Sequence, residues 1–250
     1  MNKITVIGTG SVGSTIAYTL AVTGIASEIV MVDINEEKAL GEALDIRQGI
    51  PFCGSSVSVY AGSYRDAAGS DIVVLTSGVA RKPGQSRLDL TQTNVNITKS
   101  IIPEITKYAD KAVYVIVSNP VDILTYVFMK CSDIPENRII GSGTILDTAR
   151  LRSRISEYYN INQKNVHAYV FGEHGDSSFV PWSIANISNI PIDGYADAIS
   201  GQDTLPMPKL DHEAIEDYMR KSGGMVISRK GATYYLSLIH ISEPTRRVVI

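Results

Sequence analysis

The sequence is poor in the features that mark secreted, membrane-spanning or metal-binding proteins. It has only two cysteines, Cys53 and Cys131, which are too far apart for redox or metal-binding spacings. No stretch approaches the roughly 18 apolar residues of a membrane span. The first apolar run is short and ends at glycines, unlike a signal peptide. These absences predict a cytoplasmic protein without a metal site.

An excess of charge of either sign is also missing. The formal net charge is -3, which gives no reason to expect binding to nucleic acid or to an acidic membrane. The sequence has no internal repeat and no low-complexity segment. Its hydrophobic content of 44% is typical of a soluble globular protein. The 250 residues suffice for one large domain or two ordinary ones.

Short apolar runs alternate with segments of helical spacing up to about residue 142. We expect strands at 3–7, 28–32, 57–60, 72–75 and 112–117, and helices at 14–22, 36–46 and 90–108. Such β-α-β alternation implies a parallel sheet with helices on both faces. The first part therefore predicts an α/β, doubly wound sheet of the Rossmann type.

The pattern changes in the second part of the chain. We expect a helix at 144–159, a strand at 166–171, a possible sheet extension at 183–187, a loop or weak helix at 193–210, and a helix at 212–221 before two glycines. This mixture predicts an α+β domain. The expected domains are 1–142 and 143–235, followed by a tail, 236–250.

A glycine-rich turn follows the first expected strand. Gly8, Gly10 and Gly13 fit the G-x-G-x-x-G pattern, and Asp33 ends the second expected strand. Glycines let the backbone approach a pyrophosphate, and the helix N-terminus that follows offers free N–H groups. Asp33 would bind ribose hydroxyls and repel a 2′-phosphate, which favours NAD over NADP.

Four longer motifs carry a family resemblance. They are GVARKPGQSRLDL at 78–90, SNPVDILTY at 118–126, GSGTILDTAR at 141–150 and GEHGD at 172–176. Together they resemble the L-lactate dehydrogenases of bacteria, and the resemblance runs from residue 1 to about 235. It implies a fermentative enzyme that interconverts lactate and pyruvate with NAD.

The resemblance implies roles for the residues of these motifs. His174 corresponds to the acid–base residue, a task that suits an imidazole because its ordinary pKa of about 6.5 is near neutral pH. Asp147 would fix the tautomer of His174. Arg150 would grip the substrate carboxylate, and Arg87, after a mobile loop, would polarise the reacting carbonyl. Asn119 would contact nicotinamide and substrate.

The remaining site residues also follow from the resemblance. Those expected at the cofactor are Gly8, Gly10, Val12, Gly13, Asp33, Lys38, Tyr64, Gly78, Val79, Ser100, Val117, Asn119 and Ser142. Those expected at the substrate are Arg81, Arg87, Asn119, Asp122, Asp147, Arg150 and Thr233. The resemblance further implies a cis bond between Asn119 and Pro120.

One position leaves the substrate open. Arg81 stands where lactate dehydrogenases often have glutamine and where malate dehydrogenases have the arginine that pairs with a second carboxylate. Glu173, Leu88 and Thr233 match the lactate type instead. We favour lactate and keep malate dehydrogenase as the alternative.

Two residues suggest regulation. Arg152 and His167 correspond to positions at which bacterial lactate dehydrogenases bind fructose 1,6-bisphosphate between subunits. The resemblance implies a homotetramer.

The last fifteen residues do not continue the family pattern. Residues 236–250 resemble the translation of a sequencing-library adapter, so we expect a truncated chain with a non-native tail. A second alternative to an active dehydrogenase is therefore an inactive NAD-binding fragment.

Overall fold

The computed structural model describes residues 2–79, 87–200, 208–230 and 236, with the side chains of residues 87 and 88 excepted. The described residues form two compact units, one of residues 2–142 with Leu236 and one of residues 143–230. Arg81, Thr233 and all of the expected tail except Leu236 lie outside the described residues. Within the described part, none of the helices is both long and apolar enough to cross a membrane.

The first unit is built on a six-stranded parallel sheet with the order β3-β2-β1-β4-β5-β6. The strands are β1 (Lys3–Ile7), β2 (Glu28–Val32), β3 (Ser58–Ala61), β4 (Ile72–Leu75), β5 (Val113–Ile116) and β6 (Ile139–Gly141). Strand β1 pairs on one side with β2 and on the other with β4, so the strand order reverses there. This is the order of a Rossmann sheet. The fold expected from the sequence is confirmed.

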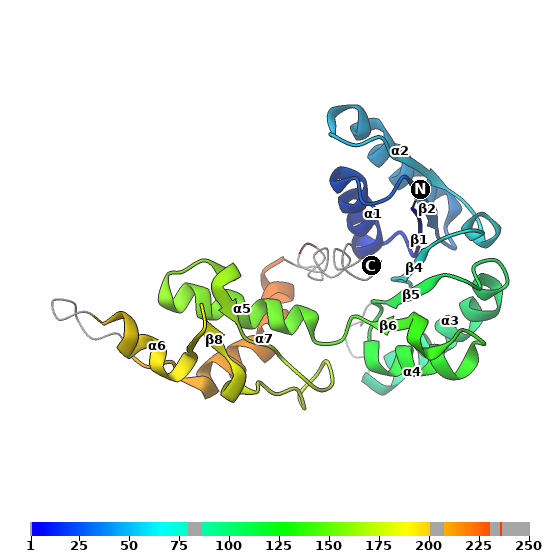
Figure 1. Cartoon of the computed structure of the whole chain (residues 1–250). Helices are drawn as coiled ribbons and strands as arrows, with labels where there is room; N and C mark the ends of the chain where they lie inside the picture. The colour runs from blue at the N-terminus through cyan, green and yellow to red at the C-terminus, as the bar shows by residue number, and fades with distance from the viewer. Residues whose placement is uncertain (1, 80–86, 201–207, 231–235, 237–250) are drawn as a thin grey trace. The chain divides into compact units, whose positions relative to one another are not determined.

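Four helices cover the two faces of this sheet. They are α1 (Ser11–Thr23), α2 (Glu36–Gly49), α3 (Arg87–Thr106) and α4 (Val121–Cys131), and short 3-10 turns lie at Ile50–Phe52, Tyr64–Ala67 and Glu136–Arg138. Helices α1 and α2 lie on one face, and α3 and α4 lie on the other (Figure 1). The strands are apolar on both sides because both faces are covered.

One hydrophobic core of the first unit lies between the sheet and helices α3 and α4. Ile7, Val30 and Leu75 from three strands pack there against Ile102 and Leu124 of the helices, and each of these side chains is almost fully buried. The burial of such apolar area is the main favourable term in folding. This core holds the carboxyl ends of the strands in register.

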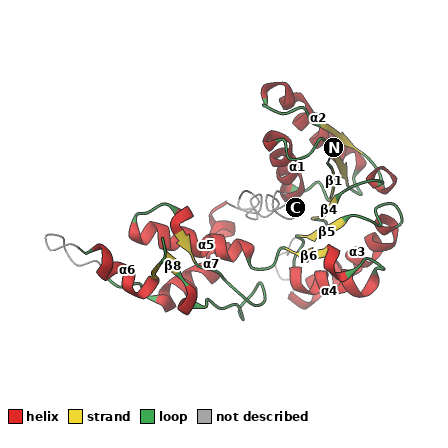
Figure 2. Ribbon diagram, in the orientation of Figure 1, coloured by secondary structure: helices red, strands yellow, loops and turns green. Residues whose placement is uncertain are grey.

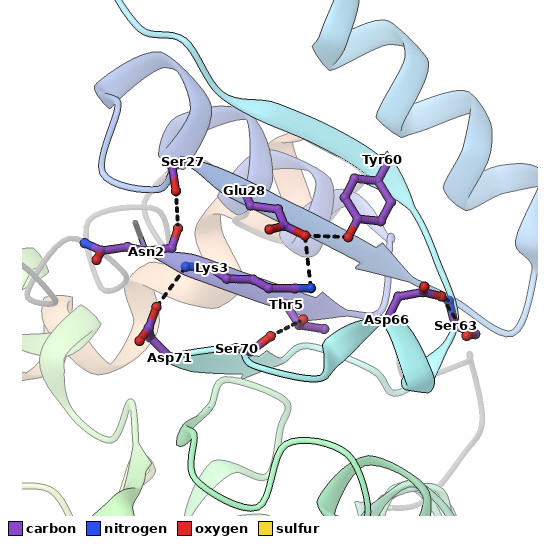
Figure 3. Close-up of polar contacts among 10 residues, drawn as sticks. All are labelled: Asn2, Lys3, Thr5, Ser27, Glu28, Tyr60, Ser63, Asp66, Ser70 and Asp71. Carbon is purple, nitrogen blue, oxygen red and sulfur yellow. Dashed lines mark hydrogen bonds and ion pairs between the residues drawn. The ribbon is translucent and has the colours of Figure 1, made fainter.

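Polar side chains surround the amino ends of β1, β2 and β4, opposite that edge (Figure 3). Lys3 Nζ lies 3.0 Å from Glu28 Oε1, and Tyr60 Oη donates to the same oxygen at 2.5 Å. The bonds from Tyr60 and Lys3 lower the pKa of Glu28, while burial and that shared bond raise the pKa of Tyr60. The main-chain N–H of Lys3 donates to Asp71. Through Lys3 on β1, Glu28 on β2 and Tyr60 on β3, this network ties three neighbouring strands together, and Asp71 adds the start of β4.

In its described residues, the second unit combines three helices with a small antiparallel sheet (Figure 2). The helices are α5 (Ile145–Tyr159), α6 (Ile192–Ile199) and α7 (His212–Lys230), the strands are β7 (Val166–His167), β8 (Asn186–Ile187) and β9 (Ile190–Pro191), and 3-10 turns lie at Gln163–Asn165 and Trp182–Ile184. Its core includes Leu151 and Ile155 of α5 and Ile215 and Met219 of α7.

Two expectations about the second unit are wrong, and a third, the loop or weak helix at 193–210, is met in part. The strand expected at 166–171 is regular only at Val166–His167, with an isolated bridge between Phe171 and Phe179. Helix α7 continues through its two glycines to Lys230, because Gly223 is buried in the helix packing. The segment 193–210 contains the helix Ile192–Ile199, whose buried face includes Tyr195.

The first unit differs from expectation at some element boundaries and in two elements that were not expected. Helix α1 starts three residues early at Ser11, and the elements α4 and β6 were not expected as regular structure. The three strands expected at 3–7, 28–32 and 72–75 are confirmed to the residue.

Candidate functional site

The turn between β1 and α1 is shaped by three glycines. Gly8 has φ +95°, and a Cβ on it would lie 2.7 Å from the nitrogen of Ser77. A Cβ on Gly13 would lie 1.8 Å from the carbonyl oxygen of Gly8. A Cβ on Gly10 would meet no atom within 4 Å. Two glycines are therefore required by packing, while Gly10 leaves open space above the N-terminus of α1.

Asp33, directly after β2, is held beside this turn. Its Oδ2 accepts hydrogen bonds from Thr9 N–H at 2.6 Å and from Thr9 Oγ1 at 3.1 Å, and its Oδ1 accepts from Asn35 N–H at 2.9 Å. Partial burial favours the neutral carboxyl group, but these hydrogen bonds outweigh it and keep the pKa of Asp33 below its usual range. Asp33 is therefore a fixed, ionised acceptor.

These features fit a dinucleotide. The open space at Gly10 lies where the first N–H groups of α1 have no intrahelical acceptor, which is an arrangement suited to phosphate. A carboxylate has about four acceptor sites, and Asp33 Oδ1 carries one of the three hydrogen bonds described, which leaves capacity for ribose hydroxyls. NAD would thus place its pyrophosphate at Gly10 and its ribose at Asp33.

Other expected cofactor residues follow the carboxyl ends of the remaining strands. Gly78 and Val79 follow β4, Val117 and Asn119 follow β5, and the buried Ser142 follows β6. Since parallel strands end at one edge of a sheet, this edge is where an open α/β sheet binds ligands. The peptide bond between Asn119 and Pro120 is cis, as the resemblance implied.

Four expected cofactor residues lie on helices or turns. Val12 is half-buried on α1, and Lys38 is exposed in the first turn of α2. Tyr64 packs against the core, and its pKa is raised by burial and by the charges of Glu104 and Asp33. Ser100 is exposed on α3, and its hydroxyl donates within that helix to Ile97 at 2.8 Å. The structure therefore brings Tyr64 near Asp33 and gives no contact of that kind for Ser100.

Sequence reasoning missed a buried amide at the same edge. Asn94 on α3 accepts a hydrogen bond from Val79 N–H at 2.9 Å and donates to the carbonyl oxygen of Asn119 at 2.8 Å. Its position was detectable in principle, since Asn94 and Thr98 continue the apolar stripe that Ile102 and Ile105 form on the buried face of α3. A polar residue on such a stripe requires partners.

The second unit brings together a histidine, a carboxylate and an arginine. His174 Nδ1 lies 2.5 Å from Asp147 Oδ2, and Arg150 Nη1 lies 2.9 Å from Asp147 Oδ1. The exposed fractions of these side chains are 17% for His174, 7% for Asp147 and 11% for Arg150. The two helix residues, one turn apart on α5, lie on one face as their spacing predicts. The group is thus shielded from solvent but reachable at the imidazole.

Two threonines at the start of α5 anchor the segment that leads to His174. Thr144 Oγ1 donates to the carbonyl oxygen of Val170 at 2.6 Å, and Val170 N–H donates to Thr148 Oγ1 at 2.9 Å. Gly172, with φ +91°, then turns the chain. These threonines were not expected as site residues, and their hydroxyls gave no distinctive sequence signal.

The far end of the His174 loop is also held. Phe171 and Phe179 exchange two backbone hydrogen bonds of 2.9 and 3.0 Å, which close the loop. Arg220 on α7 donates to the carbonyl oxygen of Ser178 at 2.8 Å. The loop is therefore fixed from α5 and from α7.

The geometry defines what this group can do. A carboxylate only accepts hydrogen bonds, so at 2.5 Å the Nδ1 of His174 is assigned the hydrogen, and Nε2 is the ring nitrogen that can gain or release a proton. Asp147 then stabilises the charge that appears when Nε2 gains a proton. This is a general acid–base arrangement.

The remaining expected residues described by the structure lie on four different elements. Arg87 opens α3, and Asp122 is exposed in the first turn of α4. Arg152 Nε donates to the carbonyl oxygen of Ala168 at 3.0 Å, with its guanidinium 4.7 Å from the centre of the Tyr169 ring. His167 is exposed on β7. Among the described residues, no group of three or more His, Cys, Asp or Glu side chains could hold a metal ion.

Comparison with known families agrees with the fold and the glycine turn. Residues 2–141 match the NAD binding domain of lactate/malate dehydrogenases, and residues 144–239 match the alpha/beta C-terminal domain of the same family. The chain belongs to the lactate/malate dehydrogenase family. Its first domain is that family's NAD-binding domain, which confirms NAD as the expected cofactor.

Individual relatives are similar over nearly the whole chain. An L-lactate dehydrogenase of a Thermoanaerobacter species is 49% identical over 249 residues, which is 100% of this chain and 77% of the relative. One from Acetivibrio thermocellus is 45% identical and is covered to 76%.

Solved structures of both branches of the family are similar. A lactate dehydrogenase from a Medee basin deep-sea metagenome library has a TM-score of 0.88 at 41% identity, covering 96% of this chain and 76% of the other. The malate dehydrogenase from Picrophilus torridus has a TM-score of 0.86 at 35% identity, covering 97% and 75%.

Proposed function

We propose that this protein is an NAD-dependent L-lactate dehydrogenase that interconverts lactate and pyruvate. The observation that carries the proposal is the contact of 2.5 Å between His174 and Asp147, with Arg150 on the same carboxylate. An oriented imidazole beside a guanidinium suits a substrate that has one hydroxyl and one carboxylate. The relatives at 45–49% identity that are L-lactate dehydrogenases support the same choice.

Each residue of the group has a proposed task. Bound NAD supplies the acceptor for the electron pair that leaves C2 of the hydroxy acid. His174 accepts the hydroxyl proton at Nε2, while Asp147 stabilises the resulting imidazolium. Arg150 binds the substrate carboxylate through its planar fork. In the reverse direction His174 returns the proton to the carbonyl oxygen, and Arg87 stabilises negative charge on that oxygen.

The malate reaction is the second candidate, because Arg81 could pair with a second carboxylate. Steady-state assays with pyruvate and oxaloacetate decide between the two, with His174→Ala as an inactive control. We expect a higher kcat/KM for pyruvate, and the reverse order would establish the malate reaction. If Arg81 pairs with a second carboxylate, Arg81→Gln should lower the activity with oxaloacetate and leave the activity with pyruvate unchanged. NADH binding without turnover of either substrate would identify an inactive NAD-binding fragment.

Assembly and regulation are further parts of the proposal. We propose a cytoplasmic homotetramer that binds fructose 1,6-bisphosphate through Arg152 and His167. In support, Arg152 is steadied by the carbonyl oxygen of Ala168 and by the Tyr169 ring, close to the exposed His167. Light scattering measures the mass, and pyruvate titrations with and without the bisphosphate test activation. An unchanged pyruvate KM would exclude it.

A further inference from the structure

A single buried amide links two loops at the carboxyl edge of the first unit's sheet. Asn94 is 3% exposed. Its Oδ1 accepts from Val79 N–H at 2.9 Å, and its Nδ2 donates to the carbonyl oxygen of Asn119 at 2.8 Å and to that of Val79 at 3.4 Å. One side chain on α3 thus contacts the loops that follow β4 and β5.

The backbone near Asn94 is closely packed, and the two loops also bond to each other. The backbone at Gly78 passes so near that a Cβ there would lie 3.3 Å from Asn94 Oδ1. Ser118, beside Asn119, donates through its hydroxyl to the carbonyl oxygen of Ser77 at 2.6 Å. The two loops are therefore tied to each other as well as to the helix, and Asn94 is the member that comes from outside both.

We propose that Asn94 is a positioning residue that fixes the backbone at Val79 and Asn119, and thereby the part of the cofactor and substrate site that these two residues form. The proposal rests on the proposed function for the roles of Val79 and Asn119. Asn94 acts through their main-chain groups. Because α3 begins at Arg87, two turns before Asn94, the same contact also sets where that helix starts relative to the sheet edge.

The amide offers a variant that separates its two contacts. Asn94→Asp keeps an acceptor for Val79 N–H but replaces the Nδ2 donor with an oxygen, which repels the carbonyl group of Asn119 and, at the longer distance of 3.4 Å, that of Val79. Asn94→Ala removes all three hydrogen bonds. The pair of variants therefore distinguishes the two loops.

Two control variants lie on the same helix face. Thr98 is fully buried one turn later, and its hydroxyl has no hydrogen-bond partner within the described part of the chain. Thr98→Val should therefore leave the site unchanged. Ile105→Val, at another fully buried position of α3, lowers stability without touching Asn94.

The test combines amide hydrogen exchange of the full chain with NADH titration and steady-state kinetics. In Asn94→Ala, exchange at Val79 and in the segment 118–121 should quicken at least about tenfold, beyond the change seen in Ile105→Val, because buried hydrogen bonds are lost. In Asn94→Asp only 118–121 should quicken. If the alanine variant does not fold, the aspartate variant, which keeps the side-chain volume, still carries the test.

Kinetics separates positioning from simple loss of stability. A misplacement of about 1 Å can cost on the order of a hundredfold in rate, so kcat of Asn94→Asp should fall ten- to a hundredfold with KM for pyruvate changed less than about threefold. Wild-type exchange at both loops, or changes equal to those of Ile105→Val, would overturn the proposal. A wild-type chain that binds NADH without turning over any 2-oxo acid would refute the proposed function instead. In that case the amide hydrogen exchange rates and the NADH affinities of the variants still test whether Asn94 is a positioning residue.

Discussion

Substitution of Gly10 or of Gly13 by alanine should change stability by different amounts, although both glycines belong to one motif. At Gly10 the backbone has φ -70° and ψ -176°, which alanine adopts freely, and the added Cβ would meet no atom within 4 Å. Replacing glycine by alanine at a helix N-cap costs up to about 1 kcal/mol. For a chain of this size that lowers Tm by about 2–4 °C at most.

At Gly13 the added methyl group would overlap neighbouring atoms. Its Cβ would lie 1.8 Å from the carbonyl oxygen of Gly8 and 2.7 Å from Thr76 Oγ1, which itself donates to that carbonyl oxygen at 2.8 Å. Overpacking typically costs 1–3 kcal/mol, and a contact this short is at the upper end of about 3 kcal/mol. Alanine recovers about 1 kcal/mol of helix propensity, which leaves a net loss of about 2 kcal/mol, or roughly 4–8 °C in Tm.

The assay is thermal unfolding together with NADH titration by fluorescence. Gly10→Ala should lose at most about 2–4 °C in Tm yet bind NADH at least about tenfold more weakly, a loss of about 1.4 kcal/mol, because its methyl group occupies the space where the phosphates approach the backbone. Gly13→Ala should lose both stability and affinity. Wild-type NADH affinity in Gly10→Ala would refute the assignment of that open space to the cofactor, and an unchanged Tm in Gly13→Ala would refute the packing argument.

Three further substitutions test the other contacts. Asp147→Asn replaces the carboxylate that pairs with His174, so kcat of the folded variant should fall by roughly 10²- to 10⁴-fold, and a loss below tenfold would contradict the pairing. Arg150→Lys keeps the charge but not the planar fork, so KM for pyruvate should rise at least about tenfold; equal KM values would rule out the proposed carboxylate contact. Tyr60→Phe should cost about 1 kcal/mol of unfolding free energy at pH 7 by removing its bond to Glu28. Because the pKa of Glu28 is lowered in the folded state, that stability is present above the unfolded pKa and is lost as pH falls through the folded pKa; denaturant titrations should show the difference shrinking as the pH falls below the ordinary glutamate pKa of 4.5.

The first unit was largely predictable because its signals are local and agree with one another. The strands Lys3–Ile7 and Ile72–Leu75 are apolar runs between turn residues, and both match expectation to the residue. Gly8 and Asp33 follow strands that pair in parallel, so topology alone brings them to one edge. At these positions the local sequence pattern and the tertiary fold favour the same structure.

The second unit was less predictable because its regular structure depends on contacts distant in sequence. The strand that begins at Val166 ends after two residues, since Ala168 and Val170 instead receive side-chain contacts from Arg152, Thr144 and Thr148 of α5. The periodicity of apolar residues in the sequence does not predict such contacts. Asn94 was missed for a related reason, because the partners of its amide are main-chain groups, which carry no residue signature.

Much of the geometry at His174 is set by α5. Thr144 occupies the N-cap of this helix, but its hydroxyl donates to Val170 and makes no side-chain cap. A threonine at this position ordinarily accepts from the first helical N–H groups, so its capping energy is given up for loop anchoring. Asp147 in the first turn compensates, because a negative charge is favoured at the positive end of a helix. The start of one helix thus supplies the carboxylate, its arginine partner and two anchors of the loop, which lets a glycine-flanked histidine keep a fixed orientation.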